Sequence, residues 1–263
     1  MKRRGKKGHD DKWSLRDDAD AEPLIRPLWR QRLVSISTNH LPIQAGLSRS
    51  TMLNIDMQKD VLTENRCFAT ACGLEVTTFP TVIGQTLAVR RAFRTAGVPI
   101  IHVAWVTRPD GVILSSKVVD NASDCQARRW DGDNSDPRRV LFDENRSEQS
   151  APALQINAGG MSVGQDLLAG FCDTPLDRIL RRLNIKTLFF RGINLDQRGF
   201  TTVAGCRSKG FDAVLVQDAI ATVSAPHLAN AIQYLMRLLH GFAAMSRNIL
   251  AAISPQNPTG VEP

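Results

Sequence analysis

The sequence predicts one α/β domain, a three-layer sandwich in which a parallel sheet lies between two layers of helices. Four apolar runs have the length of buried strands, and segments of helical period separate them. The runs are residues 51–58, 98–105, 187–190 and 213–218. Strands that alternate with helices form parallel sheets covered on both faces. About 200 residues of this pattern can bury a sizeable core, so no second domain is needed.

The first run ends abruptly in a carboxylate, and a helical pattern follows it. We expect residues 51–58 to form a buried strand that delivers Asp56 to an edge of the sheet. In the next segment, residues of one face recur at spacings of four, three and four, and Gly97 supplies a C-terminal stop. These residues are Val82, Thr86, Val89 and Phe93. The pattern predicts a helix between the first two strands.

The segment after Thr174 carries the signals of a helix start. Thr174 can cap the helix, Pro175 suits the first helical position, and Asp177 completes a capping box. One apolar stripe follows, made of Leu176, Ile179, Leu180 and Leu183. Two further helices are expected, one from near Gly199 and one over residues 226–245.

A ligand site is expected beyond the carboxyl ends of the strands, where Asp56 and the residues after Gly192 should converge. Four blocks in this frame resemble the isochorismatase-like cysteine hydrolase superfamily in order and spacing, over roughly residues 45 to 245. The blocks are residues 54–58, 170–177, 192–197 and 210–222. Within this superfamily, the sequence is most similar to the branch of C–N hydrolases that act on biuret, carbamoyl and other small amide substrates. This resemblance implies a Rossmann-like fold.

The resemblance also implies three catalytic positions, of which this chain keeps one. Amidases of the superfamily use an Asp as general base, a Lys that stabilises charge and a Cys thiolate that attacks the carbonyl. Asp56 matches the Asp. Gln165, six residues before Phe171, stands at the Lys position. Arg198, six residues after Gly192, stands at the Cys position.

These two replacements argue against thiol chemistry. Arginine has no usable nucleophile and stays protonated, and glutamine cannot supply the charge of a lysine. We expect Arg198 to close the site through a bidentate ion pair with Asp56, which would lower the pKa of the Asp. The alternative is that the guanidinium points outward and binds an anionic ligand such as a carboxylate. The resemblance further implies a cis peptide at Ile193–Asn194, just before the nucleophile position.

Five further residues are candidates for binding substrate. They are Gln58, Trp105, Phe171, Asn194 and Asp196. Trp105 ends the second strand, where it either lines the pocket or fills a loop. Asp196 is either a polar residue of the pocket or a structural hydrogen-bond partner of the turn. The resemblance implies a small amide or carboxylate ligand, and its identity stays open because the loops between residues 106 and 165 match no pattern.

Neither a metal nor a cofactor is expected. His102 lies inside an apolar strand, as a packed core residue or as a ligand, and no second His or carboxylate stands at metal spacing around Asp56. The five cysteines are an odd number without paired metal spacing, which fits a reducing compartment and a cytoplasmic protein. Cys172, expected to be a packing residue, and Cys206, about two turns beyond Arg198, are both poor replacements for the nucleophile.

The ends of the chain differ in kind from the domain expected over residues 33–250. Residues 1–32 hold ten Lys or Arg and six Asp or Glu, a net charge of +4 out of +7 for the whole chain. A basic tail can attract nucleic acid, but we favour a solvated, disordered extension and expect no nucleic-acid partner. No signal-type or transmembrane run is present, so no membrane partner is expected. Residues 251–263 predict a flexible tail.

Two functions remain open. The first is a hydrolase of this superfamily acting on small amide or carbamoyl substrates, with thiol catalysis lost or strongly impaired. The second is a pseudoenzyme that keeps the fold, a ligand pocket and an oligomer interface. A homo-oligomer is expected in both cases, because the superfamily generally forms one and residues 226–245 carry apolar side chains on more than one face. These are Leu228, Ile232, Leu235, Leu238, Leu239 and Phe242.

Overall fold

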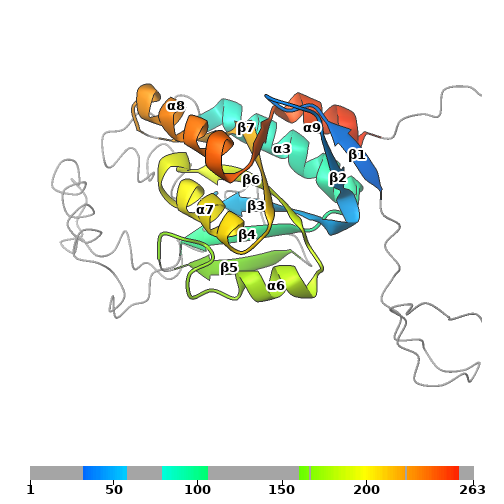
Figure 1. The fold of residues 1–263 in the computed structure, drawn as a ribbon, viewed down its shortest axis with the longest axis horizontal. Coiled ribbons are helices and arrows are strands. Elements are labelled where there is room, and N and C mark those ends of the chain that lie inside the picture. Colours follow the sequence, from blue (N-terminus) through cyan, green and yellow to red (C-terminus); the bar gives the residue numbers. More distant parts are fainter. Residues whose placement is uncertain (1–31, 58–78, 106–159, 166, 223, 255–263) are drawn as a thin grey trace, which may run out of the picture.

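The computed structural model describes residues 32–57, 79–105, 160–165, 167–222 and 224–254 (Figure 1). The strands are β1 (Leu33–Ile36), β2 (Ile43–Gly46), β3 (Ser50–Ile55), β4 (Ile100–Trp105), β5 (Met161–Gln165), β6 (Thr187–Ile193), β7 (Asp212–Ala221) and β8 (Phe242–Ala244). The helices are α3 (Phe79–Thr95), α6 (Leu176–Arg182), α7 (Phe200–Ser208), α8 (Pro226–Leu235) and α9 (Ser246–Ile253). Three short turns complete the elements: η1 (Leu47–Arg49, 3-10), η3 (Leu195–Gly199, π-type) and η4 (Met236–His240, π-type).

Six of the strands form one sheet in the order β5–β4–β3–β6–β7–β8, and every neighbouring pair is parallel. The antiparallel pair β1–β2 forms a separate ribbon. Helices lie on both faces of the sheet, which confirms the predicted α/β sandwich (Figure 1). Four strands were not predicted from the sequence: β1, β2, β5 and β8. Helix α9 continues three residues past the domain end that was expected at residue 250. Within the described ranges, no helix is long and apolar enough to cross a membrane.

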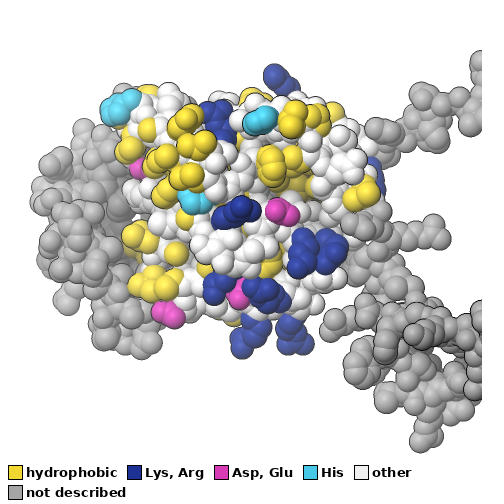
Figure 2. Space-filling view, viewed as in Figure 1, with side chains coloured by type: hydrophobic (Ala, Val, Ile, Leu, Met, Phe, Trp, Pro, Cys, Tyr) yellow, Lys and Arg dark blue, Asp and Glu magenta, His cyan; other side chains and the backbone are white. Residues whose placement is uncertain are grey.

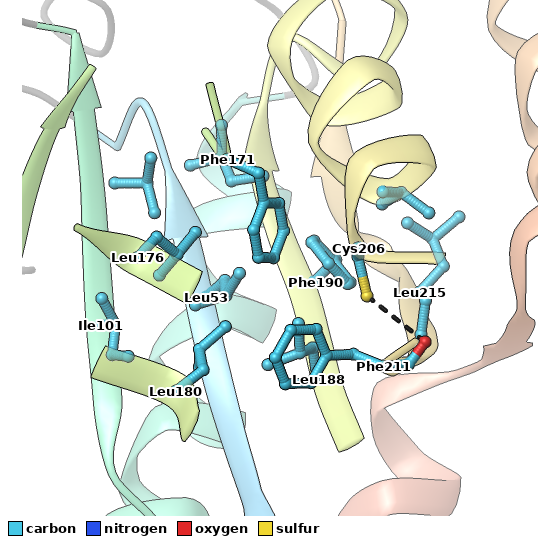
Figure 3. Packing of buried hydrophobic residues seen from close by; sticks show 14 of the residues in the cluster. Leu53, Ile101, Phe171, Leu176, Leu180, Leu188, Phe190, Cys206, Phe211 and Leu215 are labelled. Atoms are coloured by element: carbon cyan, nitrogen blue, oxygen red, sulfur yellow. Dashed lines mark hydrogen bonds between the residues drawn. The ribbon is translucent and has the colours of Figure 1, made fainter. Parts of the chain in front are cut away.

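The sheet separates two hydrophobic cores. On one face, α3, α9 and β1 pack on the sheet, and the rings of Phe93 and Phe189 meet edge to face with centroids 4.9 Å apart. On the other face, α6, α7 and η4 cover the central strands, as Figure 3 shows for Leu176, Leu180 and Cys206. Because consecutive residues of a strand point to opposite faces, each central strand contributes to both cores.

Helix α3 follows its predicted pattern. Val82, Thr86, Val89 and Phe93 are all buried against the sheet. Gly97 adopts a left-handed conformation with φ of 73° just after the helix, the position where a glycine terminates a helix at little cost. The helical period of the sequence therefore identified both the buried face and the end of α3.

Helix α6 begins differently from its prediction. The hydroxyl of Thr174 accepts a hydrogen bond from the Leu176 N–H over 3.3 Å, so Thr174 does serve the helix start. Asp177 instead binds Arg181 over 2.9 Å, a pair one turn apart. The capping box is therefore wrong, because the carboxylate points along the helix surface to a cation.

The continuous helix predicted over residues 226–245 is also wrong. Helix α8 passes into η4, and the chain then turns at Gly241 and forms the edge strand β8. A Cβ on Gly241 would stand 2.2 Å from the carbonyl oxygen of Ala213, so only glycine permits this approach to β7. Pairing with β7 buries Ala243 and Ala244, which explains an apolar run that local periodicity assigned to a helix.

Candidate active site

The carboxyl ends of four adjacent strands assemble the candidate site. In the order β5, β4, β3 and β6, these ends carry Gln165, Trp105, Asp56 and the turn η3 with Arg198. Asp56 follows β3 directly with φ of 49°, a left-handed conformation in which Asp is enriched among non-glycine residues. The predicted convergence of Asp56 with the residues after Gly192 is confirmed.

The carboxylate of Asp56 receives three donors. Arg198 Nη1 donates to Oδ2 over 3.3 Å, and Gln165 Nε2 donates to Oδ1 over 3.3 Å. The backbone N–H of Trp105 also donates to the carboxylate. Asp56, Gln165 and Arg198 are each at most 8% exposed. The three side chains thus form one buried polar group.

The predicted ion pair between Arg198 and Asp56 is present, but its geometry differs from the bidentate pair we expected. One nitrogen of the guanidinium contacts the carboxylate, at 3.3 Å. The guanidinium carbon lies 3.8 Å from the centroid of the Trp105 ring, within cation–π range. Stacking on the indole fixes the orientation of the guanidinium, and in that orientation only one N–H reaches Asp56. Trp105 therefore lines the site, one of its two predicted roles.

Burial dominates the electrostatics of this pair. Loss of hydration raises the pKa of Asp56, and the opposing effects of Arg198, Gln165 and the Trp105 amide offset only part of that rise. The lowered pKa that we expected is therefore wrong, because a single contact does not compensate for removing the carboxylate from water. Burial also lowers the pKa of Arg198, which Asp56 opposes. The guanidinium nonetheless stays protonated at physiological pH.

Within the Asp56–Gln165–Arg198 group, two buried atoms have no hydrogen-bond partner among the described residues, Gln165 Oε1 and Arg198 Nε. Leaving a buried donor or acceptor unpaired is costly, so these atoms are the ones that a ligand would satisfy. Gly170 lies beside the amide, since a Cβ there would stand 3.2 Å from Gln165 Oε1. Together with the carboxylate of Asp56, the site presents one acceptor, one donor and one titratable oxygen pair.

The turn η3 begins with a cis peptide at Ile193–Asn194, as the resemblance implied. The carbonyl oxygen of Asn194 accepts hydrogen bonds from the N–H groups of Gln197 and Gly199, over 3.3 Å and 3.1 Å. These two amides stabilise the turn internally. They are therefore not free to act as oxyanion donors for a substrate carbonyl.

Asp196 serves the structure of the turn. Its carboxylate accepts hydrogen bonds from the hydroxyls of Thr222 and Ser224, the latter over 2.6 Å, and so ties η3 to the segment after β7. This contact supports the structural alternative for Asp196 over a role in the pocket. Sequence reasoning missed both hydroxyls. Thr222 closes the last resembling block and could have been found there, whereas Ser224 carries no signal.

Of the two remaining substrate-binding candidates, the structure describes only Phe171. Phe171 lies in the hydrophobic core, stacked on Phe211 with ring centroids 6.0 Å apart (Figure 3). The apolar ring is buried under α7, against Gly205, which gives Phe171 a packing role, and its role in binding substrate stays a prediction. Gln58 lies outside the described residues.

The two described cysteines differ in burial. Cys206 is buried, its thiol donates to the Phe211 carbonyl oxygen over 3.7 Å (Figure 3), and burial raises its pKa. Cys172 is exposed, contrary to the packing role we expected. No thiol is among the hydrogen-bond partners of Asp56 in the part of the chain that the structure describes.

His102 is a core residue, one of its two predicted roles. Its ring nitrogens lie 3.3 and 3.4 Å from the side-chain nitrogen of Asn54, and burial together with two arginines lowers its pKa to about 4. The imidazole is therefore neutral at physiological pH. Among the described residues, no group of three or more His, Cys, Asp or Glu side chains could hold a metal ion.

Comparison of the chain with known proteins identifies a family and several relatives. A family model for the isochorismatase domain matches residues 50–247. The chain is 24% identical to ureidoacrylate amidohydrolase RutB of Methylorubrum extorquens over 216 residues, 80% of this chain and 86% of that protein.

Solved structures share the fold. A cysteine hydrolase from Pseudomonas syringae pv. phaseolicola superposes with a TM-score of 0.67 at 18% identity, over 85% of this chain and 98% of that one. N-carbamoylsarcosine amidase from Thermoplasma acidophilum gives a TM-score of 0.55 at 20% identity, over 75% and 96%. With a family match over most of its length and the same α/β architecture, the chain belongs to the isochorismatase family of hydrolases.

Proposed function

We propose that this protein binds a small ureido or amide carboxylate at the Asp56 site and does not hydrolyse it through a thiol. One observation carries the proposal: Arg198, which the resemblance to the superfamily assigns to the nucleophile position, contacts Asp56. A guanidinium neither attacks a carbonyl nor gives up its proton at physiological pH. The lysine position holds the neutral Gln165, so the charge that would activate a thiol is also missing.

The ligand class is supported by the relatives and by the polar groups of the site. Ureidoacrylate and N-carbamoylsarcosine both combine a ureido group with a carboxylate. A guanidinium is the side chain best suited to bind a carboxylate, which it contacts through two parallel N–H groups. Gln165 Oε1 and Asp56 supply acceptors for the N–H groups of a ureido ligand.

Because Arg198 makes only a single contact with Asp56, a ligand carboxylate can replace Asp56 as its partner. A ligand carboxylate would offer the guanidinium two short charge-assisted bonds in place of one contact of 3.3 Å. Arg198 Nε, which has no hydrogen-bond partner, supplies the second donor. The Trp105 ring would keep the guanidinium in place during this exchange.

A second function is favoured by the raised pKa of Asp56. A carboxyl that keeps its proton closer to neutral pH can act as a general acid without any covalent intermediate. Cleavage of a vinyl ether by proton transfer, as in the isochorismatases themselves, needs such a group and no thiol. This reaction predicts a rate that falls as pH rises through the pKa of Asp56 and disappears in Asp56→Asn.

Calorimetric titration with N-carbamoylglycine and with its uncharged carboxamide tests the binding proposal. Wild-type protein is expected to bind the carboxylate at least about tenfold more tightly, the equivalent of one extra charge-assisted bond. Arg198→Gln should abolish this preference, whereas Arg178→Gln, which removes an exposed arginine, should keep it. Equal binding of the two compounds by wild type would contradict the proposal. So would rapid ammonia release that iodoacetamide abolishes.

The protein is also proposed to form a homo-oligomer through α8 and η4. Exposed large apolar side chains gather on these elements, where Figure 2 shows them on one face of the molecule. They are Leu228, Tyr234, Leu235, Leu238 and Leu239, with Phe242 of β8 beside them. Contiguous apolar patches of this kind commonly mark surfaces that another chain covers.

A further inference from the structure

A row of polar side chains crosses the sheet on the face that α3 covers, and the Asp56 site does not use it. Asn54 of β3 is in register with His102 of β4 on one side and with Arg191 of β6 on the other. All three side chains are buried. Helix α3 adds Thr86 and Arg90, also buried, directly above the row. Five polar residues thus meet where a hydrophobic helix-on-sheet contact would normally lie.

Arg191 brings a positive charge into this layer, and the described residues supply no counter-ion for it. Its side chain is 1% exposed and is the largest among the fully buried ones. Nη1 donates to the Thr86 carbonyl oxygen over 2.7 Å, whereas Nε and Nη2 have no hydrogen-bond partner. Among the described residues, no carboxylate forms an ion pair with Arg191. A buried charge left unpaired is one of the most costly features a protein interior can contain.

Among the described neighbours of Arg191, none supplies a negative charge to it. Arg90 is close enough to lower the pKa of Arg191 further, in addition to the larger effect of burial. His102 is neutral, because burial and the two arginines lower its pKa to about 4. The side-chain oxygen Oδ1 of Asn54 has no hydrogen-bond partner among the described residues, but it is a neutral acceptor and supplies no negative charge. The Thr86 hydroxyl is a further unpaired group that can donate.

We propose that this layer binds a small monovalent anion of halide size between α3 and the sheet, held by Nε and Nη2 of Arg191 and by the hydroxyl of Thr86. The anion would satisfy three unpaired groups and the charge of Arg191 at once. Its size is limited because α3 lies within hydrogen-bond distance of Arg191, and Val89 and Phe93 of the same helix are buried in the core that adjoins this contact. The site is separate from the Asp56 group, which already contains its own anion.

Thermal unfolding at constant ionic strength tests the proposal. Wild-type protein in sodium chloride or bromide is expected to melt about 5 to 10 °C higher than in sodium gluconate, if the halide reaches about a hundredfold excess over its Kd. The shift should saturate with halide concentration. Arg191→Met should lose the shift, while Arg178→Met, the same substitution at an exposed arginine, should retain it.

Crystals of wild-type protein grown in bromide supply an independent test that needs no variant. An anomalous peak beside the Arg191 guanidinium supports the proposal, and a water molecule or an acidic side chain of this chain at that place would overturn it. Thr86→Val should reduce the halide shift in melting temperature without abolishing it. A halide shift that is absent in wild type, or unchanged in Arg191→Met, would also overturn the proposal.

Discussion

Replacing Arg198 with methionine should make the stability of the protein depend strongly on pH. Methionine is unbranched and apolar, so it can still pack on the Trp105 ring. The buried carboxyl of Asp56 then keeps only the Gln165 amide and one backbone N–H as donors. The pKa of Asp56 is already raised by burial, and it rises further in Arg198→Met because the opposing positive charge is lost.

The sign of the effect follows from this direction. A carboxyl whose pKa is higher in the folded than in the unfolded protein stabilises the fold fully only below its unfolded pKa of about 4. That contribution is lost as pH rises through the folded pKa. Removing one partner of a buried ion pair lowers the free energy of unfolding by about 3 to 5 kcal/mol. Because Arg198 and Asp56 share a single contact of 3.3 Å, we expect a value at the lower end of this range. We expect a loss of about 3 kcal/mol at pH 8 and about 1 kcal/mol or less at pH 5.

Urea unfolding of wild type and Arg198→Met at pH 5, 6, 7 and 8 measures this difference. In Asp56→Asn/Arg198→Met no titrating group remains in the pair, so the pH dependence should disappear. Arg178→Met controls for the loss of one positive charge at the surface. The reasoning is refuted if Arg198→Met loses the same free energy of unfolding at every pH, because Asp56 would then not be ionising in a buried site.

Catalysis, backbone geometry and assembly provide three more tests. Arg198→Cys alone should produce no amidase activity, whereas Arg198→Cys with Gln165→Lys should release ammonia from a ureido compound in an iodoacetamide-sensitive way. Activity of the single variant alone would contradict the roles assigned to the two positions. Gly192→Ala should cost at least about 4 kcal/mol, because a Cβ there would stand 2.0 Å from a carbonyl oxygen of β3. Gly84→Ala in α3, with open space around it, should be neutral or slightly stabilising, and a soluble Gly192→Ala with the wild-type melting temperature would refute the contact. Leu239→Asp should convert an oligomer into a monomer by light scattering, and a monomeric wild-type protein at micromolar concentration would contradict the interface.

Local patterns predicted helix α3 and strand β3. The period of α3 placed four side chains in the core and a glycine at its end, since each helical residue has a fixed direction relative to its neighbours. Strand β3 was recognised because its apolar run stops at Asp56. The distance of six residues from Gly192 placed Arg198 in the turn η3, and there its side chain contacts the carboxylate of Asp56.

Local patterns failed where a distant segment decided the outcome. The apolar run after α8 reads as a helix, but the close approach of Gly241 to Ala213 and the pairing with β7 make it a strand. Phe171 precedes a recognisable helix, yet its ring is buried under α7. Nothing in the order of residues indicates that Asn54, His102 and Arg191 share one row of the sheet, because strand order and register bring them together.

The amino-acid sequence, with its resemblance to the superfamily, determined which side chains stand at the three expected catalytic positions: a carboxylate, an amide and a guanidinium. That assignment rests on residue identity and on the spacing of the blocks that resemble the superfamily. The tertiary structure decided how those groups behave. It stacked Arg198 on Trp105, reduced the ion pair to one contact and removed Asp56 from water. The pKa of Asp56 therefore rises where a solvated ion pair would have lowered it, because hydration depends on every segment that packs around the carboxylate.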